Sequence, residues 1–422
     1  MIDDFRSGHG RVMRIPDSLY VHIPFCGSRC SYCDFFSTVT DRNDDGIVGA
    51  VVTATLERIE ELALRFGVTG FRTVYVGGGT PSALPRDELR RLLSGIGRRA
   101  GSVREWTVEA NPESTDEDFL DILRGAGVTR LSFGIQSLDD RLLSELGRKA
   151  RAADSISALR RAARLDFRLS ADLIAGVSRA GGLAEELRFL VEEGVEHLSV
   201  YDLTLEEGTV LKSRWERGQF SIQGEDEAAD ERRAADEILA TRGYSRYEVS
   251  NYALPGSESA HNLVYWRMGS WIGAGPGATG TISEDWAEEQ TGGIGAARPG
   301  LDGGSLRIEE TRSLRRYAAG AAGAEAKESL VSPADSAFEV MMMAFRTREG
   351  LDCAAFERRF GLEPAGLIAD SLERWKPRIV RGENRIALDA AGLDLLNRFL
   401  VDCLAELETT FPGAPAEQCQ GF

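Results

Sequence analysis

The chain has 422 residues, of which 42% are hydrophobic and 28% charged, as in ordinary soluble globular proteins of two or three domains. Its 67 acidic and 50 basic residues give a net charge of −17, which disfavours nucleic acid as a partner because phosphates need basic contacts. No apolar run approaches the roughly 18 residues that span a membrane. The polar N-terminus also lacks the apolar stretch of a secretory signal.

The six cysteines do not form the framework of a disulfide-rich protein. Three of them are close together, and Cys353, Cys403 and Cys419 lie far apart. Unpaired cysteines of this kind indicate a reducing compartment, so we predict a cytoplasmic protein.

Cys26, Cys30 and Cys33 form a C-x3-C-x2-C run directly after a segment that alternates like a strand. A four-iron cluster bound by three cysteines keeps one iron free for a small molecule. The alternatives are a zinc site, with His22 as the nearby fourth ligand, or three unrelated buried thiols. Zinc usually takes four ligands, often as two separated pairs. The spacing therefore favours a [4Fe-4S] cluster on the three cysteines.

After the cysteines, strand-like and helix-like segments alternate. Counting the segment before the cysteines, the pattern predicts six strands separated by helices, which is typical of a parallel α/β sheet curled into a partial (β/α)6 barrel. Beyond the first, the expected strands are 73–76, 105–109, 130–135, 168–174 and 197–203, and the expected helices are 47–64, 86–96, 116–125, 152–165, 184–193 and 225–240.

Polar or glycine residues follow or end several of these strands. The run 77–80 is Gly-Gly-Gly-Thr, Glu109 ends the third strand, Gln136 ends the fourth, Arg148 lies beyond it, and Asp172 ends the fifth. Each alone is an ordinary polar residue or turn. Because the carboxyl ends of parallel strands meet at one rim of a barrel, together they indicate a cofactor pocket.

The cysteine spacing resembles the signature of the radical S-adenosylmethionine (radical SAM) superfamily. The resemblance implies that the methionine moiety of SAM binds the open iron. One electron from the cluster then cleaves SAM to a 5′-deoxyadenosyl radical. By the same resemblance the glycine run looks like the loop that meets the methionine amine. Glu109 could accept a ribose hydroxyl.

From about Leu19 to about Asp402 the chain is similar to the oxygen-independent coproporphyrinogen III dehydrogenase family and, within it, to the heme chaperone branch HemW. The similar motifs include residues 20–26, 77–82, 133–137, 146–148, 172–176, 199–203 and 247–253. The resemblance implies SAM contacts, some of them to a second SAM position, from Tyr20, Tyr32, Gly78, Gly79, Thr80, Glu109, Gln136, Arg148 and Asp172.

Three departures from the family pattern bear on activity. Phe35 stands where the true dehydrogenases have a fourth cysteine, as in the chaperone branch. The segment 177–181 lacks the usual Leu-Pro-Gly-Gln-Thr turn, and Ala150 replaces a common histidine. These differences favour a chaperone over a dehydrogenase, and no catalytic residue is assigned.

His261 begins the motif His-Asn-x2-Tyr-Trp. Histidine is a standard axial ligand of heme iron, and flanking aromatic rings suit a flat macrocycle. The motif is linked with heme binding in the chaperone branch. The alternative is a core histidine hydrogen-bonded beneath the barrel mouth, and both interpretations remain open.

The C-terminal part alternates further helical patterns with one short strand-like segment, 385–388, which predicts a winged-helix-like domain. The expected domains are an N-terminal extension (1–17), the barrel and its extension (18–285), a flexible Gly/Ala-rich linker (286–330), the winged-helix-like domain (331–410) and a loose tail (411–422).

These observations predict a cytoplasmic heme chaperone that binds a [4Fe-4S] cluster, SAM and heme. Its expected partners are an electron donor and heme-acceptor proteins, respiratory and membrane-associated, and it is expected to form a homodimer. The rival interpretation is an enzyme of porphyrin biosynthesis that decarboxylates the propionates of coproporphyrinogen III. A structural zinc or iron–sulfur protein without SAM is the least favoured alternative.

Overall fold

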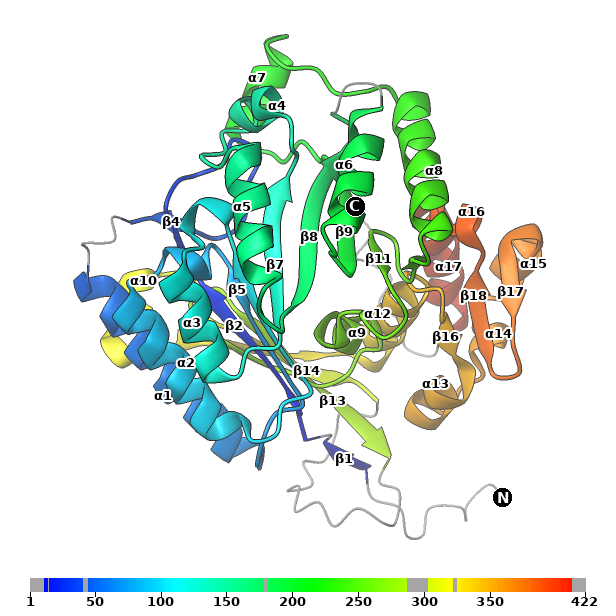
Figure 1. The fold of residues 1–422 in the computed structure, drawn as a ribbon. Coiled ribbons are helices and arrows are strands. Elements are labelled where there is room, and N and C mark those ends of the chain that lie inside the picture. The colour runs from blue at the N-terminus through cyan, green and yellow to red at the C-terminus, as the bar shows by residue number, and fades with distance from the viewer. Residues whose placement is uncertain are drawn as a thin grey trace.

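A nine-stranded sheet forms the centre of the protein, in the order β10-β11-β9-β8-β7-β6-β5-β2-β12. Helices cover its outer side, as Figure 1 shows. In this computed structural model the described residues are 11–13, 15–40, 45–177, 181–286, 303–321 and 325–411.

Six parallel strands build the expected partial barrel, so this prediction is confirmed. A further strand, β12 (Ile272–Ala274), extends the sheet parallel to β2, whereas β11 (Asn251–Ala253) and β10 (Ser245–Arg246) run antiparallel at the other edge. The six strands are β2 (Ser18–Ile23), β5 (Thr73–Gly78), β6 (Glu105–Ala110), β7 (Arg130–Gln136), β8 (Arg168–Ala175) and β9 (His197–Asp202).

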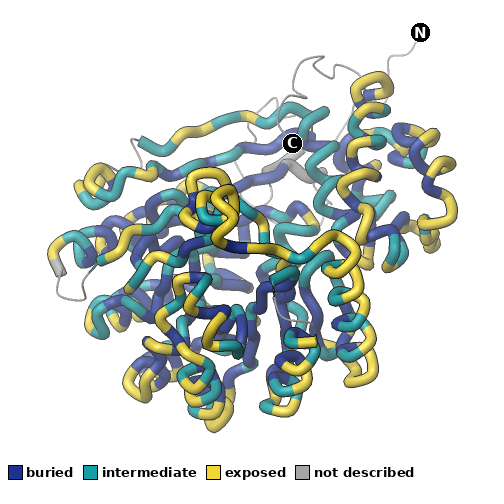
Figure 2. Tube along the Cα trace, turned by 90° about the horizontal axis from the view of Figure 1, so that it is seen from above, coloured by how far each residue is buried: buried dark blue, intermediate teal, exposed yellow. Residues whose placement is uncertain are grey.

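Strand β7 shows why the interior of this barrel is polar. Its sequence alternates, and Leu131, Phe133 and Ile135 are fully buried in the main hydrophobic core. Successive side chains of a strand point to opposite faces, so Arg130, Ser132, Gly134 and Gln136 face the interior, where they line a cavity. Figure 2 shows the buried strands enclosed by helices with exposed outer faces.

The helices connect the strands and lie close to their predicted positions. Helix α3 illustrates the local signals: the Asp116 side chain accepts the Phe119 amide at its start, and Gly127 with φ of 89° ends it. The helices are α1 (Asp45–Arg65), α2 (Arg86–Ala100), α3 (Glu117–Ala126), α4 (Asp140–Glu145), α5 (Ala152–Ala162), α6 (Gly182–Glu192), α7 (Val210–Glu216), α8 (Glu225–Thr241) and α9 (Ala260–Trp266). Among the described residues, no helix is long and apolar enough to cross a membrane.

A four-stranded antiparallel sheet, β1-β13-β14-β15, occupies part of the expected linker. Strands β14 (Ser305–Glu309) and β15 (Lys327–Val331) pair there because Leu306 and Ile308 join the main core. Strand β1 (Arg11–Met13), in the expected N-terminal extension, pairs with β13 (Thr279–Trp286). The predicted Gly-rich excursion lies mostly outside the described residues.

The C-terminal domain has its own hydrophobic core, built around residues such as Phe345, Phe356 and Phe399. Its helices pack beside a three-stranded sheet in the order β16-β18-β17, so the predicted helical, winged-helix-like domain is confirmed. The elements are α12 (Pro333–Ala344), β16 (Leu351–Asp352), α13 (Cys353–Phe360), α14 (Pro364–Leu367), α15 (Ala369–Arg374), β17 (Ile379–Arg381), β18 (Arg385–Leu388), α16 (Ala390–Leu393) and α17 (Leu396–Thr410). Of the expected tail only Phe411 is described, and it packs into this core.

Candidate cluster and cofactor site

The cysteine loop, residues 24–40, follows β2 and is tied to segments far away in sequence. The Ser31 amide donates to the Leu146 carbonyl at 2.9 Å, and the Ser31 carbonyl accepts from the Leu211 amide at 2.7 Å. Within the loop, the Thr38 amide donates to the Pro24 carbonyl at 2.7 Å. Backbone hydrogen bonds to distant segments therefore support the conformation of the loop.

The glycine run at the end of β5 lies directly against this loop. The Gly79 amide donates to the Ile23 carbonyl at 2.7 Å. A Cβ on Gly79 would lie 2.7 Å from the carbonyl oxygens of both Ile23 and Phe25. Gly78 has φ of +103°, and a Cβ there would lie 2.4 Å from the His22 ring. Only glycine therefore allows the end of the strand to approach the loop this closely.

The cysteine thiols accept hydrogen bonds from side chains of other segments. Thr80 Oγ1 donates to Cys26 Sγ at 3.5 Å, and Arg148 Nη1 donates to Cys30 Sγ at 3.6 Å. Burial raises the pKa of Cys26 and that of Cys33, and for Cys26 the Thr80 hydroxyl partly offsets this. Donors of this kind stabilise the thiolate form that binds metal.

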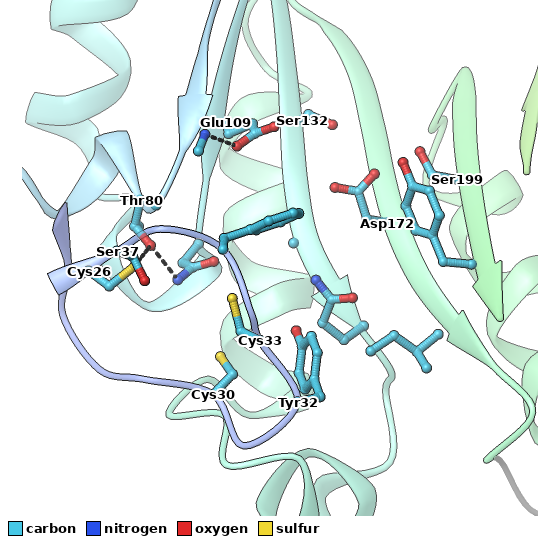
Figure 3. A pocket seen from close by; sticks show the side chains of 18 of the residues that line it. Cys26, Cys30, Tyr32, Cys33, Ser37, Thr80, Glu109, Ser132, Asp172 and Ser199 are labelled. Carbon is cyan, nitrogen blue, oxygen red and sulfur yellow. Dashed lines mark hydrogen bonds between the residues drawn. The ribbon is translucent and has the colours of Figure 1, made fainter. Parts of the chain in front are cut away.

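A cavity of ≈ 350 Å³ extends from the cysteine loop into the barrel. Figure 3 shows the three sulfur atoms on the loop, with Glu109, Asp172 and Ser199 on the strands across from them. The predicted site residues that line this cavity are Cys26, Cys30, Tyr32, Cys33, Gly78, Gly79, Thr80, Glu109, Gln136, Arg148 and Asp172.

Glu109 and Asp172 are the two carboxyl groups that were predicted inside the cavity. Tyr75 Oη donates to Glu109 Oε1 at 2.6 Å, and the Gly78 amide donates to Oε2 at 3.0 Å. Burial raises the pKa of Glu109 to about 7, although these two hydrogen bonds oppose the shift. Burial also raises the pKa of Asp172, opposed by a hydrogen bond from Ser199. Glu109 is therefore poised to change protonation near neutral pH, and both carboxyl groups can accept hydroxyl groups of a ligand.

Gln136 and Arg148 lie at an irregular strand end. The register of β7 against β8 shifts between Gly134 and Gln136, and Gln136 has φ of 68°. A left-handed residue other than glycine is uncommon and often marks a functional site. Arg148 Nη2 donates to Asn111 Oδ1 at 3.0 Å and to the Gly134 carbonyl. Its buried Nε has no hydrogen-bond partner among the described residues, so a donor remains for a ligand.

Tyr20 does not line the cavity, in contrast to the other predicted SAM contacts. Its hydroxyl lies 2.8 Å from His22 Nδ1, and His22 Nε2 lies 2.9 Å from the Phe36 carbonyl. Both ring nitrogens of His22 are therefore occupied. His22 is not placed to act as a fourth metal ligand, and the Tyr20 contact stays a prediction.

His261 lies at the start of α9 and is fully buried. Its Nδ1 is 2.9 Å from Thr73 Oγ1 and its Nε2 is 2.7 Å from Tyr265 Oη. Burial, followed by the charge of Arg130, lowers the pKa of His261 to about 3, so the ring is neutral. This geometry fits the core interpretation of His261, because both nitrogens have protein partners. Heme ligation by His261 stays a prediction.

Several cavity residues were not predicted from the sequence. Most of them share one signal: they alternate along the strands with apolar residues, so they face the interior of the barrel. The exceptions are Asn111, which follows β6, and Asn262, which lies on helix α9. The list includes Tyr75, Asn111, Arg130, Ser132, His197, Ser199, Tyr201 and Asn262.

The donor set fits an iron–sulfur cluster and SAM. Among the described residues, no three His, Cys, Asp or Glu side chains converge on a point that would hold a single metal ion, as zinc would require. Three thiols spread along one loop suit a cluster whose irons are bound by separate cysteines. A ligand that carries a nucleoside could approach the backbone closely at Gly78 and Gly79. It would also find polar partners in the free Nε of Arg148 and in the two carboxyl groups.

Two family models match parts of this chain. A family model described as the radical SAM superfamily matches residues 20–179, and one described as the HemN C-terminal domain matches residues 331–395. The two matches together cover the cysteine loop, most of the barrel and most of the C-terminal domain.

Relatives and a solved structure extend the match along the chain. A heme chaperone HemW of Lactococcus lactis is 30% identical over 408 residues, covering 93% of this chain and 99% of that protein. A HemW of Mycobacterium tuberculosis H37Rv is 38% identical over 273 residues, covering 63% of this chain and 70% of that protein. The structure of Escherichia coli coproporphyrinogen III oxidase (HemN), a radical SAM enzyme, aligns with a TM-score of 0.72 at 20% identity, covering 92% of this chain and 90% of that one. At this identity the structural match concerns the fold alone.

Proposed function

Because the chain belongs to the HemW family of radical SAM proteins, we propose that it is a heme chaperone. In this proposal it binds a [4Fe-4S] cluster, SAM and heme, and it transfers heme to acceptor proteins. The observation that carries the proposal is the similarity to the L. lactis HemW, which spans 93% of this chain and 99% of that protein. A match of this extent includes the C-terminal domain as well as the barrel.

Each part of the cavity has a role in the proposal. Cys26, Cys30 and Cys33 hold the cluster, and the cluster, when bound, supplies an open iron and an electron to SAM. The backbone at Gly78 and Gly79 and the remaining predicted contacts bind and orient SAM.

The second candidate is an oxygen-independent coproporphyrinogen III dehydrogenase, and Phe35 argues against it. In the resemblance described above, dehydrogenases have a cysteine two positions after Cys33. Here Phe35 lines the cavity with 64% of its side chain exposed, so this position has no thiol to offer.

The proposal places the protein in the cytoplasm. It includes an electron donor, a homodimeric assembly and acceptors of the respiratory chain, associated with the membrane. Nucleic acid is not among the proposed partners, because the net charge of −17 opposes phosphate contacts.

Anaerobic reconstitution tests the cluster. We expect about four irons per chain, and Cys26→Ala, Cys30→Ala or Cys33→Ala should each abolish the iron–sulfur absorbance. Cys353→Ala is a matched control, because Cys353 lies in the C-terminal domain and does not line the cavity. Stoichiometric zinc without iron–sulfur absorbance would contradict the cluster assignment.

Heme binding and coproporphyrinogen III turnover, measured side by side on the reconstituted protein, test the function. We expect a heme Soret band, passage of heme to an apo-cytochrome, and little or no decarboxylation with SAM and an electron donor. Efficient decarboxylation would transfer the assignment to the dehydrogenase.

A further inference from the structure

Arg130 is a buried cation without a close counter-charge. It begins β7 and is 2% exposed. Its only hydrogen bond among the described residues is a long one, 3.5 Å from Nη1 to Thr107 Oγ1, and no carboxylate of the described residues forms an ion pair with it. Burying a charge without a partner costs several kcal/mol. The guanidinium lines the cavity, so its remaining nitrogens face open space.

The neighbouring acidic groups are engaged elsewhere. Glu105, at the start of the adjacent strand β6, caps helix α9 by accepting the amides of Ala260 at 3.0 Å and His261 at 2.9 Å. Glu109 accepts hydrogen bonds from Tyr75 and Gly78, as described above. Burial raises the pKa of Glu109 and that of Asp172, and the positive charge of Arg130 opposes both shifts at longer range. The charge of Arg130 is therefore not neutralised by contact.

Arg130 lies at the floor of the cavity, away from the cysteines. Gln136, at the other end of β7, is six positions beyond Arg130, which is about 20 Å along an extended chain. Ser132, Ser199 and Asn262 line the cavity together with it. Burial, followed by Arg130, keeps the pKa of His197 well below its usual range, so the adjacent imidazole is neutral. The floor thus combines one cation with neutral hydroxyl, amide and imidazole groups.

We propose that the floor of the barrel is a carboxylate-binding subsite, in which the free guanidinium nitrogens of Arg130 bind a carboxylate of the ligand in the cavity. The planar fork of arginine matches a carboxylate in two parallel hydrogen bonds. A phosphate dianion fits less well, because Glu109 and Asp172 line the same cavity and would repel its second negative charge. Only the source of the carboxylate rests on the proposed function: it is a propionate of heme or the amino-acid end of a SAM molecule in the second SAM position, which is not bound to the cluster.

Arg130→Met tests the subsite, because methionine keeps the length of the side chain without its charge. Arg130→Lys is the second variant, since it keeps the charge but loses the fork. The matched control is Arg168→Met: Arg168 is the register partner of Arg130 on β8 but does not line the cavity. The probes are heme, mesoheme dimethyl ester, in which both carboxylates are blocked, and SAM. Dissociation constants are measured on the full-length protein with its cluster, and melting temperatures on the ligand-free protein.

We expect Arg130→Met to raise the dissociation constant of one carboxylate ligand by about 10- to 100-fold. Arg130→Lys should raise this constant less, and Arg168→Met should leave it unchanged. Weaker heme binding with unchanged dimethyl ester binding identifies a propionate, whereas weaker SAM binding with unchanged heme binding identifies the amino acid of SAM. The melting temperature should not fall, because an unpaired buried charge has been removed.

Unchanged affinity for both heme and SAM would overturn the subsite. A lower melting temperature with equal weakening toward heme and its dimethyl ester would also overturn it, since Arg130 would then be a structural charge. If the wild-type protein binds no heme at all, the proposed function fails, and the SAM measurement still decides the subsite.

Discussion

Replacing Gly79 by alanine should separate the glycine run from the cysteine loop. The new Cβ would lie 2.7 Å from the carbonyl oxygens of Ile23 and Phe25, and 3.0 Å from the Phe25 amide nitrogen. These are backbone atoms, so no rotation of a side chain relieves the contact. The two hydrogen bonds at this junction, from the Gly79 amide to Ile23 and from the Thr80 amide to Phe25, are both 2.7 Å long and would lengthen or break.

The expected cost follows from these contacts. Two backbone hydrogen bonds contribute about 1 kcal/mol each, and forced overpacking adds about 1–3 kcal/mol. The free energy of unfolding should therefore fall by about 3–5 kcal/mol. Since Thr80 Oγ1 donates to Cys26 Sγ, the same displacement should also remove support from the first cysteine.

Urea denaturation and iron content after anaerobic reconstitution measure the two effects. Gly27→Ala is the matched control: Gly27 lies in the same loop, and its Cβ would meet nothing within 4 Å. We expect the control to match the wild type in both measurements. A Gly79→Ala protein with wild-type stability and full iron content would refute the close approach of the strand and the loop.

Two further predictions concern buried titratable groups. Burial raises the pKa of Glu109 from 4.5 to about 7, so between these values the folded protein keeps a proton that the unfolded chain releases. The stability of the ligand-free protein should fall as pH rises through this window. Glu109→Gln should reduce the fall by up to about 3 kcal/mol in denaturations near pH 5 and pH 8, and an unchanged pH dependence would contradict this. His261→Ala leaves the hydroxyls of Thr73 and Tyr265 without their partner, so it should cost about 2–4 kcal/mol and keep the Soret band of added heme. Loss or shift of that band at unchanged stability would instead make His261 the heme ligand.

Much of the barrel could be predicted from local patterns. All six parallel strands were expected, because each carries alternating or continuous apolar residues between turn signals. Local sequence patterns did not predict strands whose formation depends on pairing with a strand elsewhere in the chain. The short alternating segments 305–309 and 327–331 were assigned to a linker, yet they pair with each other. The pattern of residues 391–407 is that of one helix, yet the structure divides this segment into α16 and α17.

The candidate site was predictable where a polar residue lies in the carboxyl-terminal half of a strand inside a motif, as with Glu109 and Asp172. Site residues at the amino-terminal ends of the strands were not predictable from the sequence. Arg130 and His197 begin their strands, at the opposite end from the cysteines, so a search at the carboxyl ends missed them. The left-handed backbone of Gln136 also leaves no mark in the sequence, because it arises from the register shift between two strands.

The hydrogen bonds that hold the cysteine loop also bear on when the loop folds relative to synthesis of the chain. Ser31 pairs with Leu146 and Leu211, so the loop closes only after well over a hundred further residues have been made. Contacts of such high sequence separation form late, because the entropy of closing long loops must be overcome first. During synthesis from the N-terminus, the three thiols therefore leave the ribosome long before their scaffold exists. Insertion of iron into a preformed loop must then follow translation of the barrel rather than accompany it.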